Sequence, residues 1–435
     1  MVQRRTVLAT LAGAALADEA GAQPAGTPTA GVGIGPDPRL PPPDPNHRVQ
    51  NFSEVVGWPE GRTPAAPAGF RVRRVAGGLD SPRWLLVLPD RDLLVAEATT
   101  VVEDPDSSKD AGQVRSGSAA ARSANRITLL RDADGDGVAE TRTVLLEGLN
   151  QPFGLALVGG HLYVANTDAL MRYPFTPGQT RIEARGERLL TLPAGGYNNH
   201  WTRNLLPSRD GRHLYVSVGS ASNNGEYGLD EEHRRACILR VGLDGGGETV
   251  FAAGLRNPIG MAFEPATGAL WAAVNERDMI GDDLVPDYIT SVQEGGFYGW
   301  PYSYWGSRPD PRMEGQRPDL VQRAIAPDYA LGSHTASIGL AFYEGGAFPQ
   351  AYHGGAFVAQ RGSWNRRPFS GYKVLFVPFK DGRPAGPPQD FLTGFMPDPA
   401  SGKAYGRPVG VFADGAGGLL VTDDVGDSVW GVSAA

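Results

Sequence analysis

The chain has 435 residues, with 59 glycines and 36 prolines, and so many turn-forming residues favour an all-β fold over a helical one. A formal net charge of -8 argues against nucleic acid as a partner. The single cysteine, Cys237, excludes a disulfide within the chain and lies in an apolar run typical of a buried strand.

The N-terminus has the pattern of an export signal. Arg4 and Arg5 precede the short apolar run Thr6 to Ala17, and a small-residue cleavage site follows near Ala22. This run is too short to span a bilayer, and no other segment of the sequence is apolar enough to do so. We therefore expect residues 1–22 to direct export to a bacterial periplasm, and residues 23–66 to form a linker rich in proline and glycine.

The rest of the chain contains a degenerate repeat. Each unit opens with a short polar or Pro/Gly segment, which we call the polar step, and continues as an apolar strand, a turn at Gly or Asp, and a second strand. The units are residues 81–98, 151–168, 200–220, 256–276, 336–362 and 407–432. Six two-stranded units at long spacing favour radial closure, which removes exposed sheet edges. The sequence predicts a six-bladed β-propeller over residues 67–435, with a pair of β-sandwiches or a β-solenoid as the alternatives.

Two polar steps precede predicted inner strands. His200 follows two asparagines in "GGYNNHW", and Arg256 and Asn257 precede the strand in "GLRNPIGMAF". A neutral imidazole at the channel can take a proton, and a guanidinium there can bind carboxylates or a developing oxyanion. A structural histidine and an arginine that ties adjacent blades together are the alternatives.

Two acidic stretches are candidate cation sites. Residues 274–302 contain Glu276, Asp278, Asp282, Asp283 and Asp287, and cysteine-free, oxygen-rich loops suit Ca²⁺. A solvated acidic loop is the alternative there. The second stretch has Asp132, Asp134 and Asp136 at positions 1, 3 and 5 of a calcium-loop pattern, but Thr143 at position 12 excludes an EF-hand. It predicts either a lone Ca²⁺ hairpin or an Asp-Gly turn.

Several cations could converge at one end of the channel, although their spacing does not require it: Arg203, Arg256, Arg361, Arg366 and Arg407. In a chain of net negative charge they would make a local anion site. The sequence contains no HExxH, CxxC, GxSxG or Walker motif, so it gives no support for those classes of site.

Together, the motifs "YNNHWTRNLLPSRDGRHLYVSVG", "LRNPIGMAF", "FYGWP", "GSWNR" and "GRPVGV" resemble the soluble quinoprotein sugar dehydrogenases, and most closely their sorbosone/aldose branch. The resemblance runs from about residue 70 to the C-terminus. It implies a six-bladed propeller that holds pyrroloquinoline quinone (PQQ) and Ca²⁺ and oxidises a sugar. The electron acceptor would be a partner such as a cytochrome or a quinone.

The resemblance also implies roles for individual residues. His200 matches the general base, and Arg256 matches the arginine beside the reacting quinone carbonyl. The implied cofactor contacts are Asn199, Asn257, Gln151 (or Asn150), Arg361 and Arg407. The cofactor Ca²⁺ would be held by the backbone carbonyls of Asp278 and Met279, and Asp283 and Tyr298 resemble the positions of a second calcium.

Two positions depart from the family pattern. Ile259 stands where a cofactor-binding glutamine is expected, and Val409 stands where a second arginine would follow Arg407. Each loss removes a polar contact to PQQ, so weaker binding is expected unless another group, such as Arg366, replaces it.

Two other function classes remain open at this point. A metal-dependent lactone hydrolase on the same fold could use Asn150, Asn199, Asn257 and Glu276 as ligands of an axial Ca²⁺. A non-catalytic propeller could bind a glycan or a partner protein. The aromatic side chains that could stack on sugars do not discriminate between these classes: Trp300, Tyr302, Trp305 and Trp364.

Overall fold

The computed structural model describes residues 32–435, so the predicted export signal at residues 1–22 lies outside the described residues. The described chain is almost entirely β-structure. Its α-helices are α1 (Ala111–Arg115) and α2 (Pro318–Arg323), and its 3-10 helices are Leu229–Glu232 and Gln350–Tyr352. None of the helices within residues 32–435 has the length and apolar character needed to cross a bilayer.

Within residues 32–435, six sheets of four or five strands follow one another along the chain. The first sheet contains β4 (Pro82–Val87), β5 (Leu93–Glu97), β8 (Arg126–Arg131) and β9 (Thr141–Leu146), and the second contains β10 (Leu155–Val158), β11 (His161–Ala165), β12 (Ala169–Pro174) and β13 (Glu187–Thr191). The third contains β14 (Leu205–Pro207), β15 (His213–Val218), β16 (Cys237–Gly242) and β17 (Thr249–Ala253), with β21 (Gly296–Phe297) at its edge, and the fourth contains β18 (Pro258–Phe263), β19 (Leu270–Val274), β20 (Pro286–Ser291) and β24 (Tyr329–Ser333), with β1 (Ile34–Gly35) at its edge. The fifth contains β25 (Ser337–Phe342), β26 (Ala356–Gln360), β27 (Lys373–Val377) and β30 (Gln389–Leu392), and the sixth contains β32 (Pro408–Ala413), β33 (Leu419–Asp423), β34 (Ser428–Ala434) and β3 (Phe70–Ala76). The remaining short strands form pairs: β2 (Glu54–Val55) with β31 (Lys403–Ala404), β6 (Thr100–Val101) with β7 (Ala119–Ala120), β22 (Ser303–Tyr304) with β23 (Arg308–Pro309), and β28 (Phe379–Lys380) with β29 (Arg383–Pro384).

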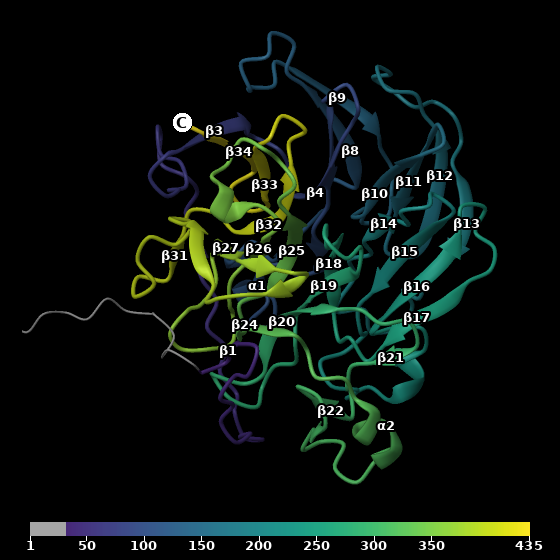
Figure 1. Ribbon diagram of the computed structural model, residues 1–435, viewed down its shortest axis with the longest axis vertical. Helices are drawn as coiled ribbons and strands as arrows, with labels where there is room; N and C mark the ends of the chain where they lie inside the picture. The colour runs from purple at the N-terminus through teal and green to yellow at the C-terminus, as the bar shows by residue number, and fades with distance from the viewer. Residues whose placement is uncertain (1–31) are drawn as a thin grey trace, which may run out of the picture.

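The first strand of each sheet lies on the inside of a closed ring. β4 contacts β10, and contacts continue through β14, β18, β25 and β32 back to β4 (Figure 1). The predicted six-bladed β-propeller is therefore confirmed. Each of the six repeats found in the sequence forms the first two strands of one blade, and these two strands pair antiparallel with each other.

Glycines allow the innermost strands to approach one another closely. A Cβ atom on Gly260 of β18 would lie 2.7 Å from the backbone nitrogen of Leu340 in β25. A Cβ atom on Gly339 would lie 2.5 Å from the carbonyl oxygen of Val409 in β32. A side chain cannot fit at these distances. The glycines of "IGMAF" and "IGLAF" are therefore needed for the inner strands to pack against one another.

The two ends of the propeller join in one blade. β3 pairs antiparallel with β34, with Phe70 opposite Ala434, so the N-terminal strand supplies the outer edge of the C-terminal blade (Figure 1). This pairing closes the ring without an unpaired strand between the first and last blades.

The segment predicted to be a linker lies against the propeller from residue 32 onward. β1 adds to the edge of β24, and β2 pairs in parallel with β31. An extended chain rich in proline and glycine exposes backbone donors and acceptors, and here they bond to strands of the propeller instead of to solvent. The described part of this segment thus differs from a free linker.

Cys237 is fully buried in the core between the second and third blades, among Leu239, Val216 and Ala165. Burial raises the pKa of its thiol to about 12. The thiol is therefore protonated and acts as a small apolar side chain, as the sequence predicted.

Candidate active site

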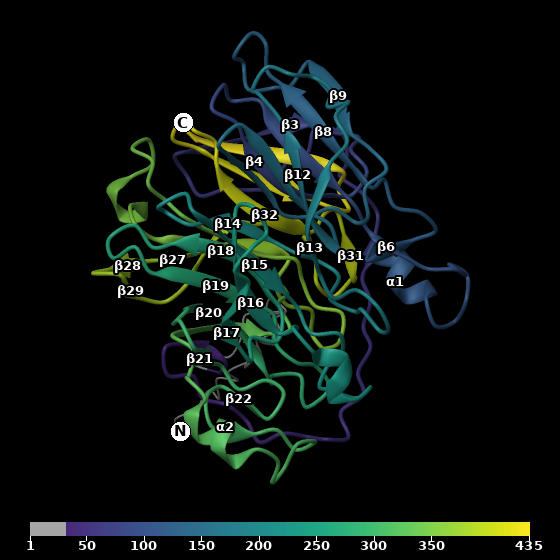
Figure 2. The same cartoon turned by 90° about the vertical axis from the view of Figure 1, so that its right-hand side faces the viewer.

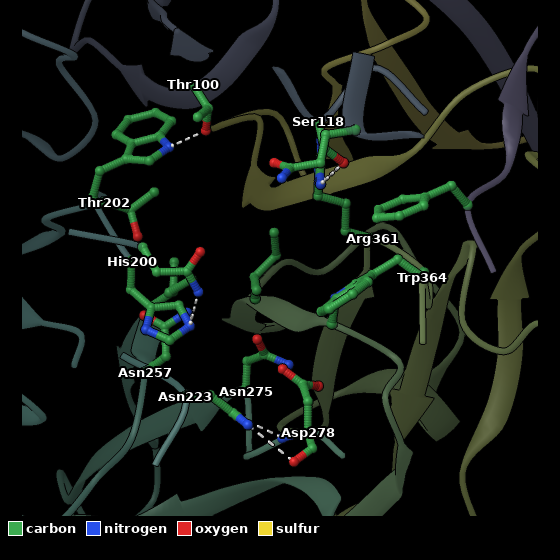
Figure 3. A pocket seen from close by; sticks show the side chains of 18 of the residues that line it. Thr100, Ser118, His200, Thr202, Asn223, Asn257, Asn275, Asp278, Arg361 and Trp364 are labelled. Carbon is green, nitrogen blue, oxygen red and sulfur yellow. Dashed lines mark hydrogen bonds between the residues drawn. The ribbon is translucent and has the colours of Figure 1, made fainter. Parts of the chain in front are cut away.

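A cavity of about 490 Å³ opens at one end of the ring. Its walls come from the residues that lead into inner strands, such as His200 before β14 and Asn257 before β18, and from loops that follow second strands, such as Asn223 after β15 and Asp278 after β19. Because every repeat starts with a polar step at the same end of its blade, the blades bring these steps together. In Figure 3, His200 faces Trp364 across this space.

His200 is held in the tautomer that a base requires. Its Nδ1 lies 2.9 Å from the backbone carbonyl oxygen of Ser220, which can only accept, so Nδ1 carries the proton. Nε2 therefore keeps its lone pair, and it lies 3.4 Å from the side-chain nitrogen of Asn199. Burial, followed by the charge of Arg256, lowers the pKa of His200 to about 3, so the ring is neutral at pH 7. The structure places His200 in the cavity wall, and its role as a general base stays a prediction.

Asn257 lies beside His200 and has an unused acceptor. Its Oδ1 is buried and has no hydrogen-bond partner among residues 32–435. A Cβ atom on Gly219 would collide with this oxygen and would lie 2.6 Å from the Cβ of His200, so only glycine fits between the two. Thr202, also in the cavity wall, has a buried hydroxyl without a partner in the same described residues. These groups are free to bind a ligand.

Arg256 lies one layer behind the cavity wall. Its guanidinium donates to the carbonyl oxygens of Asn223 and Asn275 and to the side chains of Asn223 and Asp278, and it does not line the cavity. The ion pair with Asp278 has an N–O distance of 3.0 Å. In this structure Arg256 therefore positions three wall residues and contributes to the lowered pKa of His200, whereas its contact with a quinone stays a prediction.

Three arginines line another side of the cavity, and two of them share one carboxylate. Arg83 and Arg361 both pair with Asp424, the latter at 2.7 Å, and Arg407 donates to Ser118 at 2.8 Å. Burial, together with the charge of Arg361, lowers the pKa values of Arg83 and Arg407 to about 10. Within the described residues, these three guanidinium groups have only the Asp424 carboxylate as a paired anion, through Arg83 and Arg361, so they leave an excess of positive charge, and an anionic ligand would relieve their mutual repulsion.

Sequence reasoning found Arg361 and Arg407 but missed Arg83. A signal was present, because Pro82, Pro258 and Pro408 open the inner strands of three aligned repeats. The residue after the proline is Arg83 in one repeat and Ile259 in another, and both line the cavity. Alignment of the repeats therefore gives Arg83 the same position in its blade that Ile259 has in the fourth blade, where the predicted glutamine is absent.

Two predicted cofactor contacts do not reach the cavity. The Gln151 side chain donates to the backbone of Thr99, at 3.0 Å, and Asn150 does not line the cavity either. Arg366 pairs with Asp283, at 2.9 Å, and donates to a backbone carbonyl. Arg366 therefore points away from Arg361 although only five positions separate them, and its predicted substitution for lost PQQ contacts has no support in this geometry.

Arg203 is also structural. It is fully buried, and its guanidinium donates to the backbone carbonyls of His200, Thr202 and Pro193 and to the side chain of Asn198. Burial lowers its pKa to about 9. It fixes the loop that carries His200 and takes no part in the group of cations at the cavity.

The predicted calcium ligands are only partly available. Asp278 and Met279 line the cavity, but the carbonyl oxygen of Asp278 already accepts from Asn223 and twice from Arg277. Its carboxylate is taken by Arg256, His334 and Asn365. These contacts leave Met279 as the available member of the predicted pair.

The second predicted calcium site is not assembled. The Asp283 carboxylate pairs with Arg366, whereas the Tyr298 hydroxyl donates to the carbonyl of Ser291, at 2.6 Å, inside the hydrophobic core. Burial raises the pKa of Tyr298 to about 12, so it stays neutral. Both side chains have structural partners of their own in this structure.

The ligands of the lactonase alternative are also separated. Asn199 and Asn257 line the cavity, but Asn150 and Glu276 do not. Glu276 is buried and accepts from the backbone of Arg277 at 3.0 Å. Burial raises its pKa to about 7. This arrangement does not supply an axial cation site from these four residues.

Of the four aromatic residues considered for sugar binding, Trp364 alone lines the cavity. Trp300 and Trp305 are buried, and the indole nitrogen of Trp300 donates to the carbonyl of Asn223. Tyr302 is half-buried and does not line the cavity. The structure thus leaves Trp364 as the candidate among them.

The turn at Asp132, Asp134 and Asp136 brings these carboxylates together with that of Glu140, and one oxygen of each lies within 4.8 Å of the others. All four are exposed. Their oxygens accept from backbone amides of the same turn, as in the 2.7 Å bond from Gly135 to Asp132. These bonds account for the cluster as an Asp-Gly turn.

Residues before the propeller also reach the cavity. Gln50 and Phe52 line it, and the Phe52 ring stacks on Trp364 with a centroid distance of 5.4 Å. Asn51 donates from its backbone to the carbonyl of Trp364 and from its side chain to that of Arg366. We call residues 47–56 the strap. Nothing in the sequence of this predicted linker indicated a place in the cavity wall.

Comparison with known proteins identifies the family. Residues 64–286 and 316–435 match the TrAA12-like family. The chain belongs to the TrAA12-like family. The strap precedes the matched residues, so this wall of the cavity lies outside the part that defines the family.

Individual relatives of this TrAA12-like protein agree with the predicted resemblance. It is 23% identical over 305 residues to the pyrroloquinoline quinone-dependent sugar dehydrogenase of Hypocrea jecorina, covering 63% of this chain and 64% of that protein. Its fold is similar to the PQQ domain of the pyranose dehydrogenase of Coprinopsis cinerea, with a TM-score of 0.68 at 22% identity, over 88% of this chain and 100% of that domain. It is also similar to the calcium structure of the Trichoderma reesei AA12 enzyme, with a TM-score of 0.69 at 19% identity, over 90% and 99% of the chains. The predicted relationship to the quinoprotein sugar dehydrogenases is confirmed.

Proposed function

We propose that this TrAA12-like protein is a PQQ-dependent oxidoreductase that oxidises a sugar of the aldose or sorbosone type. One observation carries the proposal: the unprotonated Nε2 of His200 lies in the same cavity as three convergent arginines. A base and an anion site in one cavity suit a reaction that removes a proton while a carboxylated cofactor is bound.

The cavity fits such a cofactor. Arg83, Arg361 and Arg407 would hold its carboxylates, because Asp424 alone leaves their positive charge in excess. The unpartnered Oδ1 of Asn257 and hydroxyl of Thr202 would bind its polar edges. When bound, PQQ would supply the acceptor for the hydride, which no ordinary side chain provides.

The residues of the chain would handle the proton. Oxidation of a sugar hydroxyl breaks a C–H and an O–H bond, and the hydroxyl proton would pass to Nε2 of His200. The ring would then carry a positive charge, which burial and Arg256 disfavour and which the carbonyl of Ser220 and the charge of Asp278 favour. Since the carbonyl of Ser220 holds Nδ1–H, the imidazole cannot rotate away from the substrate without losing this bond.

Calcium belongs to the same proposal with narrower support. It rests on the resemblance and on the calcium-containing structure of the Trichoderma reesei relative. In this chain Met279 is the wall residue that would contribute to holding the ion, because the carbonyl of Asp278 is already bonded. A titration of PQQ in the presence of a chelator, with and without added Ca²⁺, tests this part: equal affinities would remove the ion from the proposal.

Export to the periplasm and a separate electron acceptor complete the proposal. The twin arginines and the apolar run at the N-terminus support export. Fractionation of a cell that produces the full chain would test the destination, and retention in the cytoplasm would overturn it.

The central experiment is reconstitution. Purified protein is titrated with PQQ and Ca²⁺, the quinone absorbance is followed, and turnover of aldoses and sorbosone is measured with a dye as acceptor. We expect His200→Ala to lower kcat by about 10²–10⁴-fold while the Kd for PQQ changes little, because the imidazole acts on the proton. Unchanged turnover in this variant would remove His200 from the mechanism, and hydrolysis of a lactone without PQQ would select the hydrolase class instead.

A further inference from the structure

An exposed pair of tyrosines stands at the edge of the cavity. Tyr197 lines the cavity three positions before His200, and its ring lies 4.3 Å from that of Tyr227, with an interplanar angle of 38°. Tyr197 is 42% exposed and Tyr227 is 58% exposed. Exposed aromatic rings that lie together beside a cavity are typical of a binding surface.

The loop that carries Tyr197 is fixed from below. The side-chain oxygen of Asn198 accepts from Arg235, at 2.6 Å, and from the buried Arg203, at 3.1 Å. Arg235 also donates to the carbonyl of Gly195, at 3.1 Å. Two guanidinium groups thus hold the backbone on both sides of Tyr197, although the ring itself faces solvent.

The loop that carries Tyr227 is held in the same way. The carboxylate of Glu226 accepts from the backbone amides of Asn223, at 3.1 Å, and Asn224, at 2.8 Å. Glu232, at the end of the loop, accepts from the amides of Ala221 and Ser222. Both rings are therefore presented by preorganised backbone, which reduces the entropy lost when a ligand binds to them.

The neighbours of the pair indicate the chemistry of its ligand. Glu226 and Asn199 line the cavity next to the rings and offer a carboxylate and an amide. A sugar ring has an apolar C–H face for an aromatic ring and hydroxyl groups that donate to a carboxylate. A flat apolar ligand would shield the Glu226 carboxylate from water and add no donor to its two backbone amides, and an anionic ligand would be repelled by it.

We propose that Tyr197 and Tyr227 form an outer subsite for the second sugar unit of an oligosaccharide whose terminal unit is oxidised at His200. The proposal rests on the proposed function and specifies its substrate class, an oligosaccharide in preference to a free monosaccharide. The tyrosine pair needs no quinone to bind a sugar ring, so the subsite can be tested separately from the oxidation.

The first test measures binding without turnover. Calorimetry on the full chain without added cofactor uses cellobiitol and maltitol, whose reduced ends have no hemiacetal to oxidise. We expect at least one of them to bind, Tyr227→Ala to weaken that binding about tenfold, and Tyr227→Phe, which keeps the ring, to bind as the unmodified protein does. Tyr302→Ala, which removes a half-buried tyrosine away from the cavity, is the matched control and should have no effect.

The second test measures turnover with PQQ, Ca²⁺ and a dye. Tyr227→Ala should raise KM about tenfold for cellobiose or maltose and leave KM for the corresponding monosaccharide unchanged. The subsite is refuted if neither alditol binds the unmodified protein, if Tyr227→Ala binds as well as Tyr227→Phe, or if the variant raises KM for the dye instead of the disaccharide. If calorimetry succeeds and turnover is absent, the outer subsite stands and the oxidoreductase assignment fails.

Discussion

At the scale of single residues, the cavity is organised by which polar groups are already bonded and which are free. Arg83 and Arg366 illustrate this difference: both are buried arginines paired with an aspartate, but Arg83 shares its carboxylate with Arg361 whereas Arg366 is the only partner of Asp283 within residues 32–435.

We expect Arg83→Gln to raise the Kd for PQQ by about 10- to 100-fold, because a charge-assisted contact to a carboxylate is lost. Arg366→Gln is the matched control and should leave the Kd unchanged. Quenching of intrinsic fluorescence by PQQ measures both values, and equal losses in the two variants would contradict the assignment.

The titration of His200 predicts a pH dependence of stability. Its pKa is about 3 in the folded chain against an ordinary value of 6.5, so between these values the unfolded chain binds more protons. Between these two pH values, His200 therefore makes the free energy of unfolding increase with pH, by up to about 1.4 kcal/mol per pH unit. The same contribution to stability disappears as the pH falls. The raised pKa values of Glu276 and Asp423 act in the opposite sense.

Comparison with His200→Ala separates these effects, because Glu276 and Asp423 are present in both proteins. The variant should gain stability relative to the unmodified protein as the pH is lowered from 7 to 4.5, and the difference should be constant above pH 7. Urea unfolding at several pH values measures it. A difference that does not change with pH would mean that His200 titrates normally in the folded chain.

The residues at the cavity could be predicted where chemistry alone identified them. His200 is one of seven histidines and sits in a polar step before a strand, so its place at the channel followed from the sequence. The arginines were harder, because Arg361 and Arg366 are five positions apart and face different partners. The repeat alignment, with Arg83 equivalent to Ile259, could have added Arg83 to the cavity, but it does not separate Arg361 from Arg366, because Arg366 lies outside the repeat unit 336–362.

At the scale of elements, the repeats could be predicted and the strap could not. A strand of the propeller shows its buried face by alternation, as in "HLYVSV" of β15, whose partners in β14 and β16 lie along the same chain. The strap has no such pattern, because it gains its contacts from Trp364 and Arg366, about 315 positions later. Its neighbour α1 projects at the edge of the molecule together with β6 (Figure 2).

The strap should slow the release of the cofactor. Phe52 stacks on Trp364 and packs so closely on α1 that a Cβ atom on Gly112 would lie 2.5 Å from its ring. Phe52→Ala opens this side of the cavity next to Arg361, and we expect it to raise the dissociation rate of PQQ about tenfold with little change in the association rate. Val56→Ala, in the same strap but 45% exposed, is the control. Displacement of PQQ after dilution measures the rate, and equal rates in both variants would show that the strap does not retain the cofactor.

At the scale of the whole molecule, the site depends on closure of the ring. The cavity takes Arg83 from the first blade and Arg407 from the last, and these two blades are joined through β3 and β34. Phe70 of β3 packs edge-on against Phe348, at 4.8 Å, and Phe391, at 5.1 Å, so β3 also fills the core between the last two blades.

Two truncations separate this closure from the strap. Removal of residues 1–66 deletes β1, β2 and the strap but keeps β3, so we expect a folded protein with a lower melting temperature. Removal of residues 1–76 also deletes β3, which exposes the edge of β34 and an aromatic core that Phe70 had covered. That protein should aggregate or lose its cooperative transition, as judged by circular dichroism on heating and by gel filtration. The two deletions differ only by ten residues at the edge of one blade. Equal melting temperatures would therefore show that the ring closes without pairing of β3 with β34. The position of Arg83 and Arg407 at one cavity would then not depend on that pairing either.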